Sequence, residues 1–329
     1  MKMSNIYRPE SFQGFGRKEN YFEGWYFKMV DGSEKKAFAV IPGISLSKDA
    51  SKSHAFVMIF DARAHKMSYY KYSTGDFWAD KRKFEIKIGN NFFTSDRLQL
   101  DCGDGSGTIS ADISMKGLKP WPVGFFSPGV MGWYRFVPFM ECYHANVSFD
   151  NAVDGYISLN RRRERTDMSG GRGYIEKDWG SSMPQSWIWM QSNHFETPGV
   201  SLFGSVAKIP WLGGYFTGYI FGFLHGNRLY KFTTYNGAGL DKIEVSGDFI
   251  EIAALNRGYR LEIRASRTQG VDLPAPRSGE MTSRVNESLS SLIEVRLTIG
   301  EKVIFSGTGR NSGLEFVGGI GELLKGLKK

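Results

Sequence analysis

The sequence predicts an all-β protein made of two fused antiparallel β-domains related by internal duplication. Its 329 residues are long for one domain and comfortable for two. The 40 glycines and the 15% aromatic content, together with few helical runs, are typical of a β-rich fold with many turns. In addition, short segments recur in the same order at an offset of about 160 residues, which chance rarely produces.

The first half is predicted to form a series of short strands separated by turns. Aromatic and β-branched runs recur at a spacing of roughly 10 residues, which favours a barrel or a sandwich. We expect strands at Tyr21–Met29, Ala37–Ile44, Ala55–Ala62, Ser68–Tyr72, Lys83–Ile88, Arg97–Leu100 and Thr108–Met115. The segment Lys119–Pro138 interrupts this series, because its prolines and glycines exclude a regular element while its aromatic residues argue against a disordered linker. We interpret it as a lid or a pocket wall, with packing between the domains as the alternative.

The second half repeats the first. The paired segments are His54–Phe60 with Thr217–Phe223, Tyr70–Thr74 with Tyr230–Thr234, Lys83–Ile86 with Lys242–Val245, Arg97–Leu100 with Arg260–Ile263, and Trp25–Phe27 with Trp187–Trp189. We therefore expect an N-terminal domain at residues 1–165 and a C-terminal domain at residues 166–329, joined near Arg161–Arg172, where Arg and Ser-Gly-Gly suit a connection. Further strands are expected at Leu292–Ile299 and Lys302–Gly307. The amphipathic tail Gly318–Lys329 should form a final helix packed on its domain, with peripheral membrane contact as the alternative.

The central stretch Gly173–Asn193 combines two carboxylates with three tryptophans. If Tyr174–Trp179 is a strand, alternation places Tyr174, Glu176 and Asp178 on one face and Ile175, Lys177 and Trp179 on the other. In Trp187–Phe195 the same alternation gathers Trp187, Trp189, Gln191 and Asn193 on one face. An aromatic and amide face suits the wall of a cavity for a large, mostly apolar ligand. The alternative is that the tryptophans are core residues and the carboxylates are solvated or salt-bridged.

These residues favour acid chemistry in an aromatic cavity. Protonating a C=C bond needs a strong acid that stays neutral until it is used. A carboxyl group in a dry pocket has a raised pKa, and a second carboxylate on the same face raises it further, which points to Asp178 with Glu176. The resulting carbocation needs a π-rich, water-poor wall. The residues assigned to that wall are Trp25, Trp179, Trp187 and Trp189, and those assigned to orienting a substrate hydroxyl are Tyr143, Gln191 and Asn193.

Composition and motifs argue against several other classes of protein. The sequence contains no GxSxG, GxxxxGK[ST] or HExxH motif and no CxxC pair. The five histidines are scattered, and Glu141 and His144 should lie on opposite faces of the strand Phe139–Phe149, so no metal site is expected. The net charge of +8 comes from dispersed basic residues without a recognisable module, so no nucleic-acid partner is expected. Two cysteines without a disulfide framework and a start without an apolar signal favour a cytoplasmic location.

Four motifs resemble the tocopherol cyclase family over roughly residues 10 to 320: FEGWYFK (Phe22–Lys28), PFMECYH (Pro138–His144), EKDWG (Glu176–Gly180) and SWIWMQSN (Ser186–Asn193). The resemblance implies two fused lipocalin-like barrels. It also implies a reaction that closes a chromanol ring by protonating the prenyl tail of a quinol, without a redox cofactor. The matching positions are Trp25, Glu141, His144, Asp178, Trp179, Trp187, Trp189 and Asn193, so Glu141 and His144 join the candidate catalytic residues.

Two functional hypotheses follow. The first is a cofactor-independent cyclase that protonates an olefin of a prenylated or polyene lipid. The second is a non-catalytic carrier that binds a lipid or isoprenoid in the same cavity. An enzyme should hold Asp178 or Glu176 facing the ligand, whereas in a carrier both point to solvent or pair with Lys177 or Arg172. Neither hypothesis fixes the substrate or the oligomeric state.

Overall fold

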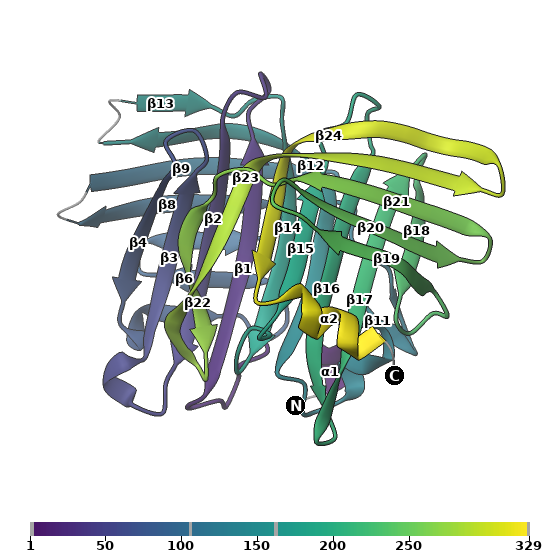
Figure 1. Ribbon diagram of the computed structural model, residues 1–329. Coiled ribbons are helices and arrows are strands. Elements are labelled where there is room, and N and C mark those ends of the chain that lie inside the picture. The colour runs from purple at the N-terminus through teal and green to yellow at the C-terminus, as the bar shows by residue number, and fades with distance from the viewer. Residues whose placement is uncertain (1–2, 105–106, 161–163, 328–329) are drawn as a thin grey trace. The chain divides into compact units, whose positions relative to one another are not determined.

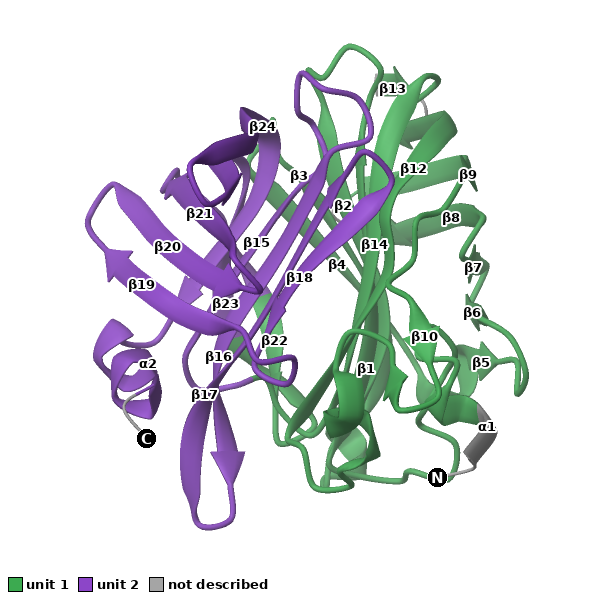
Figure 2. Cartoon of the chain, turned by 90° about the vertical axis from the view of Figure 1, so that its right-hand side faces the viewer, with its two compact units in different colours: residues 1–183, 274–283 green, residues 184–273, 284–329 purple. Residues whose placement is uncertain are grey.

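The computed structural model describes residues 3–104, 107–160 and 164–327, and it confirms the all-β fold (Figure 1). The chain forms two compact units (Figure 2). Unit 1 contains residues 1–183 and 274–283, and unit 2 contains residues 184–273 and 284–329. Most described strands of each unit belong to one large antiparallel sheet.

The sheet of unit 1 has twelve described strands. From one end to the other, hydrogen bonding joins β4 (Lys66–Tyr72), β3 (His54–Asp61), β2 (Ala37–Leu46), β1 (Tyr21–Val30), β14 (Gly171–Gly180), β12 (Cys142–Leu159), β9 (Gly107–Lys116), β8 (Arg97–Asp104), β7 (Asn91–Thr94), β6 (Glu85–Ile88) and β5 (Phe77–Ala79), and β13 (Glu164–Asp167) pairs with β12. The first strand of this sheet in the sequence, β1, therefore pairs with its last strand, β14.

The sheet of unit 2 has ten described strands. Its order is β18 (Arg228–Thr233), β17 (Gly214–His225), β16 (Ser201–Trp211), β15 (Trp187–Ser192), β24 (Lys302–Val317), β23 (Glu280–Ile299), β21 (Tyr259–Ser266), β20 (Phe249–Asn256) and β19 (Gly239–Val245), with β22 (Val271–Arg277) paired to β23. In the first sheet, β1, β2, β3 and β4 follow one another in sequence and pair in that order. In the second sheet, β15, β16, β17 and β18 do the same. The other strands of each sheet lie on the opposite side of β1 or of β15.

This shared order agrees with internal duplication. The predicted pairs that fall on β1 and β15, β3 and β17, and β4 and β18 occupy equivalent places in the two sheets. The pair Arg97–Leu100 and Arg260–Ile263 does not, because β8 is the fourth strand from β1 on its side and β21 is the third from β15. The predicted boundary at residues 165 and 166 falls inside β13, so the described part of the predicted connection, residues 164–172, lies in β13, in the start of β14 and in the turn between them. Residues 161–163 of the predicted connection lie outside the described residues.

Both sheets curl so that strands distant in the hydrogen-bonding order face each other. In unit 1 the hydroxyl of Tyr72 on β4 lies 3.6 Å from the sulfur of Cys102 on β8 and accepts a 3.0 Å hydrogen bond from Asn91 on β7. In unit 2 the amide of Asn256 on β20 donates a 2.7 Å hydrogen bond to the carbonyl of Lys231 on β18. Curling brings apolar residues of opposite strands together, which forms the core of each unit.

Aromatic packing dominates the core of unit 1. Trp25 stacks on Phe84 with ring centroids 5.5 Å apart, and Phe27 lies 6.1 Å from both Phe84 and Phe93. In unit 2 the core contains Ile188, Met190, Val206, Phe221, Phe223 and Ile263, among others. Alternate residues of β1 and β15 therefore point inward, as expected for strands.

The segments outside the sheets agree with the prediction. Between residues 119 and 138 there are only the two-residue strands β10 (Val123–Gly124) and β11 (Ser127–Pro128) and the 3-10 helix η3 (Gly132–Phe136). The tail forms helix α2 (Ile320–Leu327), which packs on β17, where the hydroxyl of Thr217 donates a 2.6 Å hydrogen bond to the carbonyl of Leu323. Among the described residues, no helix combines the length and apolarity needed to cross a membrane.

Candidate functional site

Strand β14 presents two chemically different faces, as its alternation predicts. On one face, the Tyr174 hydroxyl donates a 2.5 Å hydrogen bond to Oε2 of Glu176, and Asp178 lies two residues further along. On the other face, Lys177 and Trp179 are buried. The prediction that Tyr174, Glu176 and Asp178 share a face is therefore confirmed.

His144 lies between the two carboxylates. In the register of β12 with β14, His144 is opposite Asp178 and Asn146 is opposite Glu176. The Nδ1 atom of His144 is 2.8 Å from Oδ1 of Asp178, and its Nε2 atom is 3.5 Å from Oε2 of Glu176. Alternation along β14 places Glu176 and Asp178 next to each other on one face. The pairing of β12 with β14 adds the imidazole of His144 between them. We call His144, Glu176 and Asp178 the proton cluster.

Two further side chains fix Glu176 in place. The Asn146 amide donates a 3.1 Å hydrogen bond to the Tyr174 hydroxyl, which in turn donates to Glu176. Burial, followed by the negative charge of Glu176, raises the pKa of Tyr174 well above its usual value. Tyr174 therefore stays protonated and keeps donating. Glu176 is 6% exposed and Asp178 is 23% exposed, so Asp178 is the carboxylate that a small molecule can reach.

The cluster binds a proton tightly at neutral pH. Burial alone would lower the pKa of His144, but the carboxylates of Asp178 and Glu176 outweigh burial and raise the pKa to about 9. His144 is consequently an imidazolium over most of the neutral range. Burial and the nearby Asp178 carboxylate raise the pKa of Cys142, whose sulfur lies 3.8 Å from Oδ1, so this group remains a thiol.

This raised pKa makes stability depend on pH. The folded state binds a proton on His144 up to about pH 9, whereas a histidine in an unfolded chain releases it near pH 6.5. The stabilisation is full below the unfolded value and is lost as the pH rises through the folded value. We expect the unfolding free energy to fall by about 2 kcal/mol between pH 6.5 and 8. Urea unfolding at a series of pH values measures this.

A His144→Gln variant is the control for that series, and its stability should vary much less over the same range. Above pH 8 a second group opposes the trend. Burial, partly offset by Glu23, lowers the pKa of Lys177 to about 8, so its deprotonation makes stability rise with pH. An unchanged slope in His144→Gln between pH 6.5 and 8 would show that other groups bind the proton.

The opposite face of β14 carries a buried ion pair. The Lys177 ammonium lies 2.5 Å from Oε1 of Glu23 on β1, and neither side chain has exposed surface. The ammonium also donates to the carbonyls of Pro9 and Ser11, and Oε1 and Oε2 of Glu23 accept hydrogen bonds of 2.9 and 3.0 Å from the backbone N–H of Gln13. The pair thus ties the segment 9–13 to the sheet of unit 1.

Trp25 and Trp179 belong to this second face and not to the face of Asp178. The Lys177 ammonium lies 4.9 Å from the ring centroid of Trp25 and 4.6 Å from that of Trp179. Trp179 also stacks on Tyr143 at 5.5 Å, and the guanidinium of Arg135 lies 4.9 Å from its centroid. These aromatic residues stabilise buried cations of the protein itself. The structure therefore does not bring Trp25, Trp179 or Tyr143 to the proton cluster.

Glu141 is also separate from the cluster. Its backbone carbonyl accepts a 2.9 Å hydrogen bond from the N–H of Ser181, which closes the end of the β12–β14 pair. Burial raises the pKa of its carboxyl group, and Arg277 opposes the shift. Gly180 permits the close approach of these strands, since it has φ +151° and a Cβ there would lie 2.2 Å from the carbonyl oxygen of Glu141.

The remaining predicted residues lie in unit 2. Ile188 and Met190 belong to its core, so Trp187, Trp189 and Gln191 occupy the other face of β15, as predicted. These three residues and Asn193 are buried. The Trp187 indole N–H donates a 2.7 Å hydrogen bond to Glu315, and the Gln191 amide donates a 3.4 Å hydrogen bond to Asn193. Their assignment to substrate binding stays a prediction.

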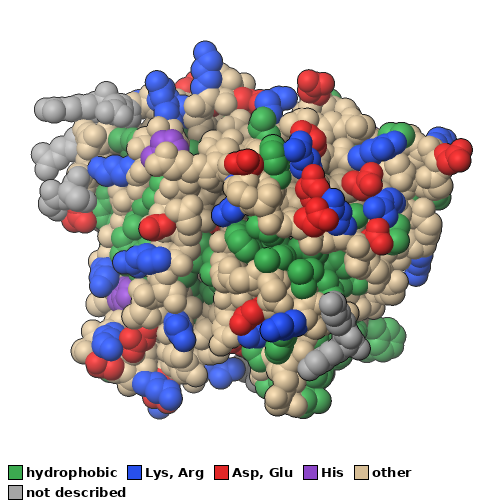
Figure 3. All heavy atoms as spheres, viewed as in Figure 1, with side chains coloured by type: hydrophobic (Ala, Val, Ile, Leu, Met, Phe, Trp, Pro, Cys, Tyr) green, Lys and Arg blue, Asp and Glu red, His purple; other side chains and the backbone are tan. Residues whose placement is uncertain are grey.

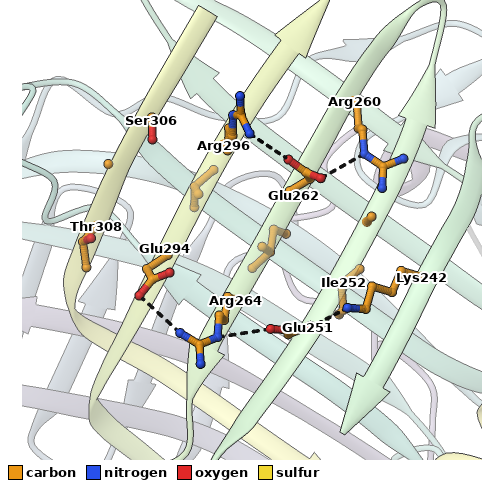
Figure 4. Close-up of a pocket in the computed structure, with 14 residues that line it drawn as sticks. Lys242, Glu251, Ile252, Arg260, Glu262, Arg264, Glu294, Arg296, Ser306 and Thr308 are labelled. Atoms are coloured by element: carbon orange, nitrogen blue, oxygen red, sulfur yellow. Dashed lines mark hydrogen bonds and ion pairs between the residues drawn. The ribbon is translucent and has the colours of Figure 1, made fainter. Parts of the chain in front are cut away.

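A charged groove of about 440 Å³ lies on the sheet of unit 2 (Figure 4). Its charged lining residues are Lys242, Glu251, Arg260, Glu262, Arg264, Glu294 and Arg296. Oppositely charged side chains on neighbouring strands form ion pairs, such as Lys242–Glu251 at 2.6 Å and Arg264–Glu251 at 3.1 Å, and so neutralise one another's charge. Cationic and anionic side chains are likewise interspersed on the face seen in Figure 3. The groove resembles a solvated sheet surface and not the expected aromatic cavity.

The proton cluster also has the composition of a metal site. His144, Glu176 and Asp178 each offer a ligand atom within 4.8 Å of the others. The expectation of no metal site considered only Glu141 as a partner of His144. An ion bound to both Nδ1 and Oδ1 at ordinary bond lengths would separate these atoms by roughly 3.4 Å. Their actual separation is 2.8 Å, which is that of a direct hydrogen bond.

Sequence reasoning missed Asn146, Tyr174, Glu23 and Lys177 as functional or supporting residues. Glu23 and Lys177 lie within the motifs FEGWYFK and EKDWG, and Tyr174 lies two residues before EKDWG, so the motifs were the available signal. Asn146 lies two residues after PFMECYH and follows His144 on the same strand face. Pairing the three motifs as neighbouring strands would have brought these residues together.

Comparison with known proteins places this architecture in a family. The model of the tocopherol cyclase-like family matches residues 104–319. The chain is 21% identical over 315 residues to the probable chloroplastic tocopherol cyclase of Oryza sativa subsp. japonica, covering 79% of this chain and 66% of that protein. It is also 21% identical over 317 residues to the chloroplastic tocopherol cyclase of Zea mays, covering 79% of this chain and 65% of that protein.

Solved structures share the fold at low identity. The crystal structure of CghA with Sch210972 has a TM-score of 0.57 and 9% identity, covering 90% of this chain and 88% of that one. A protein from Nitrosomonas europaea described as AttH has a TM-score of 0.52 and 14% identity, covering 90% and 92% of the two chains. These likenesses concern the lipocalin-like fold alone. The family match covers most of the chain, and on that ground the chain belongs to the tocopherol cyclase-like family.

Proposed function

We propose that this chain is a cyclase-type enzyme that closes a ring in a small hydrophobic substrate by moving a proton through His144, Asp178 and Glu176. The observation that supports this most is the imidazole held between two carboxylates, one of them partly exposed, on strands whose neighbouring residues are mostly buried. The names of the plant relatives suggest a prenylated quinol as the substrate class. The chain spans about two thirds of their length, so the activity of those proteins is carried over only as a proposal.

The proposed reaction balances without an electron acceptor. The cluster gives its proton to one carbon of a C=C bond, so a C–H bond forms and the π bond breaks. The substrate's hydroxyl oxygen then attacks the resulting cation and forms the C–O bond of the new ring. The hydroxyl proton passes to the cluster, which returns to its starting state. Substrate and product are isomers, as a cyclase requires.

Asp178 is the proposed proton donor to carbon. An imidazolium with a pKa of about 9 is a weak acid toward an alkene, so His144 serves as the proton store. When an apolar substrate excludes water, the charged pair becomes less favourable than a neutral imidazole with a neutral carboxyl group. The proton then lies on Asp178. The carboxylate of Glu176, held by Tyr174, lies 3.5 Å from Nε2 and stabilises the positive charge of the ring.

The environment of the carboxylates favours the enzyme over the carrier hypothesis. Lys177 pairs with Glu23, and Arg172 pairs with Asp150 through Nη2 and Oδ2 at 2.8 Å. Neither cation therefore engages Asp178 or Glu176 in an ion pair of this kind. A carrier has no use for a shared proton beside its ligand, whereas an acid catalyst depends on one.

Deuterium labelling tests the proposal. The wild-type protein is incubated in D₂O with a hydroquinone bearing a prenyl tail, and the product is analysed by mass spectrometry. We expect an isomeric, cyclised product with one deuterium bound to carbon, at the same yield with and without a chelator. Binding without turnover would instead favour the carrier, and loss of turnover with the chelator would favour a metal at the cluster. A protein-free incubation measures spontaneous cyclisation.

A further inference from the structure

Gly24 is an exception within strand β1. The other nine residues of this strand are buried, and Gly24 alone is partly exposed. In the register of β1 with β14, Gly24 lies directly opposite Asp178. Opposite residues of antiparallel strands share a face, so the missing side chain of Gly24 leaves room beside the Asp178 carboxylate.

Partly exposed residues continue in a row across neighbouring strands of unit 1. Asp178 and His144 are partly exposed on strands β14 and β12, whose central residues are otherwise mostly buried. On β2, Ile41 is partly exposed, and its Cγ2 atom lies 3.8 Å from where a Cβ of Gly24 would be. The row therefore runs from Ile41 over Gly24 to the proton cluster, and Ile41, Gly24, Asp178 and His144 are each partly exposed.

Neither packing nor backbone conformation requires a glycine at position 24. A Cβ there would meet only Pro42 and Ile41 atoms at 3.7 and 3.8 Å, which is ordinary contact. The neighbouring Gly43 differs, since its Cβ would lie 2.4 Å from the ring of Phe56. A strand glycine that packing does not demand often marks the close approach of a ligand.

The surroundings of Gly24 are apolar on the side away from the cluster. Phe22, two residues before it on the same face, is buried, and Ile41 of β2 lies beside it. The ring of Phe56 occupies the space over Gly43, the cross-strand neighbour of Gly24 on β2. An apolar surface with a carboxylate at one end suits a hydrocarbon chain whose reacting carbon meets that carboxylate.

We propose that Gly24 is the floor of a substrate slot and determines specificity: the apolar chain of the substrate lies against the bare backbone of β1 and thereby reaches Asp178. This inference rests on the proposed function, because it names where that substrate lies. It assigns Gly24 no part in proton transfer. A side chain at this position should exclude substrate from the slot while leaving the cluster intact.

Substitution of Gly24 tests the slot by steric exclusion. We expect Gly24→Val to raise the KM for a hydroquinone with a long prenyl tail at least tenfold, and Gly24→Ala to raise it less. The pH profile and the melting temperature should stay close to those of the wild type, because β-branched residues suit strands. A Gly239→Val variant, at a strand glycine with open space around it in unit 2, is the matched control and should behave as the wild type.

Equilibrium binding of the same hydroquinone separates this inference from the proposed function. If the wild type binds without turnover, the enzyme proposal fails, yet weaker binding by Gly24→Val still supports the slot. If Gly24→Val binds and reacts as the wild type does, the slot is wrong. Should Gly24→Val fail to fold, Gly24→Ala decides in the same way. Failure of the folded wild type to bind this probe would also overturn the slot.

Discussion

Replacing Glu23 with glutamine should destabilise the protein by about 3–5 kcal/mol, the usual cost of removing one partner of a buried ion pair. The Lys177 ammonium has no exposed surface, and without the carboxylate it would keep only carbonyl groups and aromatic rings as partners. Burial already lowers the pKa of Lys177 to about 8, so the uncompensated lysine would release its proton. That release limits the loss of stability and prevents it from reaching the full cost of a buried charge.

Urea unfolding, with amide exchange at Gln13, measures this effect. The Gln13 N–H donates to both carboxylate oxygens of Glu23, so its exchange should accelerate in Glu23→Gln. The double variant Glu23→Gln with Lys177→Met should recover part of the lost stability, because the two changes act on one interaction. As a control, Asp112→Asn breaks the half-exposed Arg97–Asp112 pair and should cost less than about 1 kcal/mol. Equal losses in Glu23→Gln and Asp112→Asn would contradict the argument.

Asp178→Asn should lower the turnover number about 10²–10⁴-fold, the range of positioned acid–base groups. The amide keeps the size of the side chain but cannot carry the proton to carbon. It also removes the carboxylate that raises the pKa of His144 most strongly, so the cluster would hold its proton less tightly. Substrate binding should change little, because the amide still fits beside Gly24. Single-turnover kinetics and equilibrium binding together separate these effects.

The stability of Asp178→Asn provides an independent check. Its unfolding free energy should fall less between pH 6.5 and 8 than that of the wild type, since His144 no longer gains as much from folding. Asp112→Asn again serves as the control and should retain full turnover. A folded Asp178→Asn protein with unchanged turnover would exclude this residue as the proton donor and leave the carrier hypothesis in place.

Strand alternation made much of the candidate site predictable. Because side chains alternate along a strand, the sequence alone placed Glu176 on the same face as Asp178, and His144 on the face opposite to that of Tyr143. The structure confirms these relations. It also confirms the tail helix and the irregular segment 119–138, where proline and glycine act locally. All of these features depend on short-range rules.

The cross-strand partners were not predictable in the same way. Whether His144 faces Asp178, which lies 34 residues later in the chain, depends on the register of β12 against β14, and bulges shift that register locally. The same limitation explains the assignment of Trp25 and Trp179 to a cavity wall. Their aromatic rings suit a ligand cation and a lysine equally well, and only the β1–β14 register reveals Lys177 opposite Trp25.

The second compact piece of unit 1, residues 274–283, bears on how the protein is made. Within unit 1, the N–H of Gly279 donates a 2.7 Å hydrogen bond to the carbonyl of Ser181, and the Ser45 hydroxyl donates a 2.6 Å bond to the carbonyl of Gly279. During synthesis from the N-terminus, residues 1–183 leave the ribosome without these partners. Unit 1 is completed only after residues 184–273, about two thirds of unit 2, have been translated, so a nascent chain holds its first sheet for that time without residues 274–283.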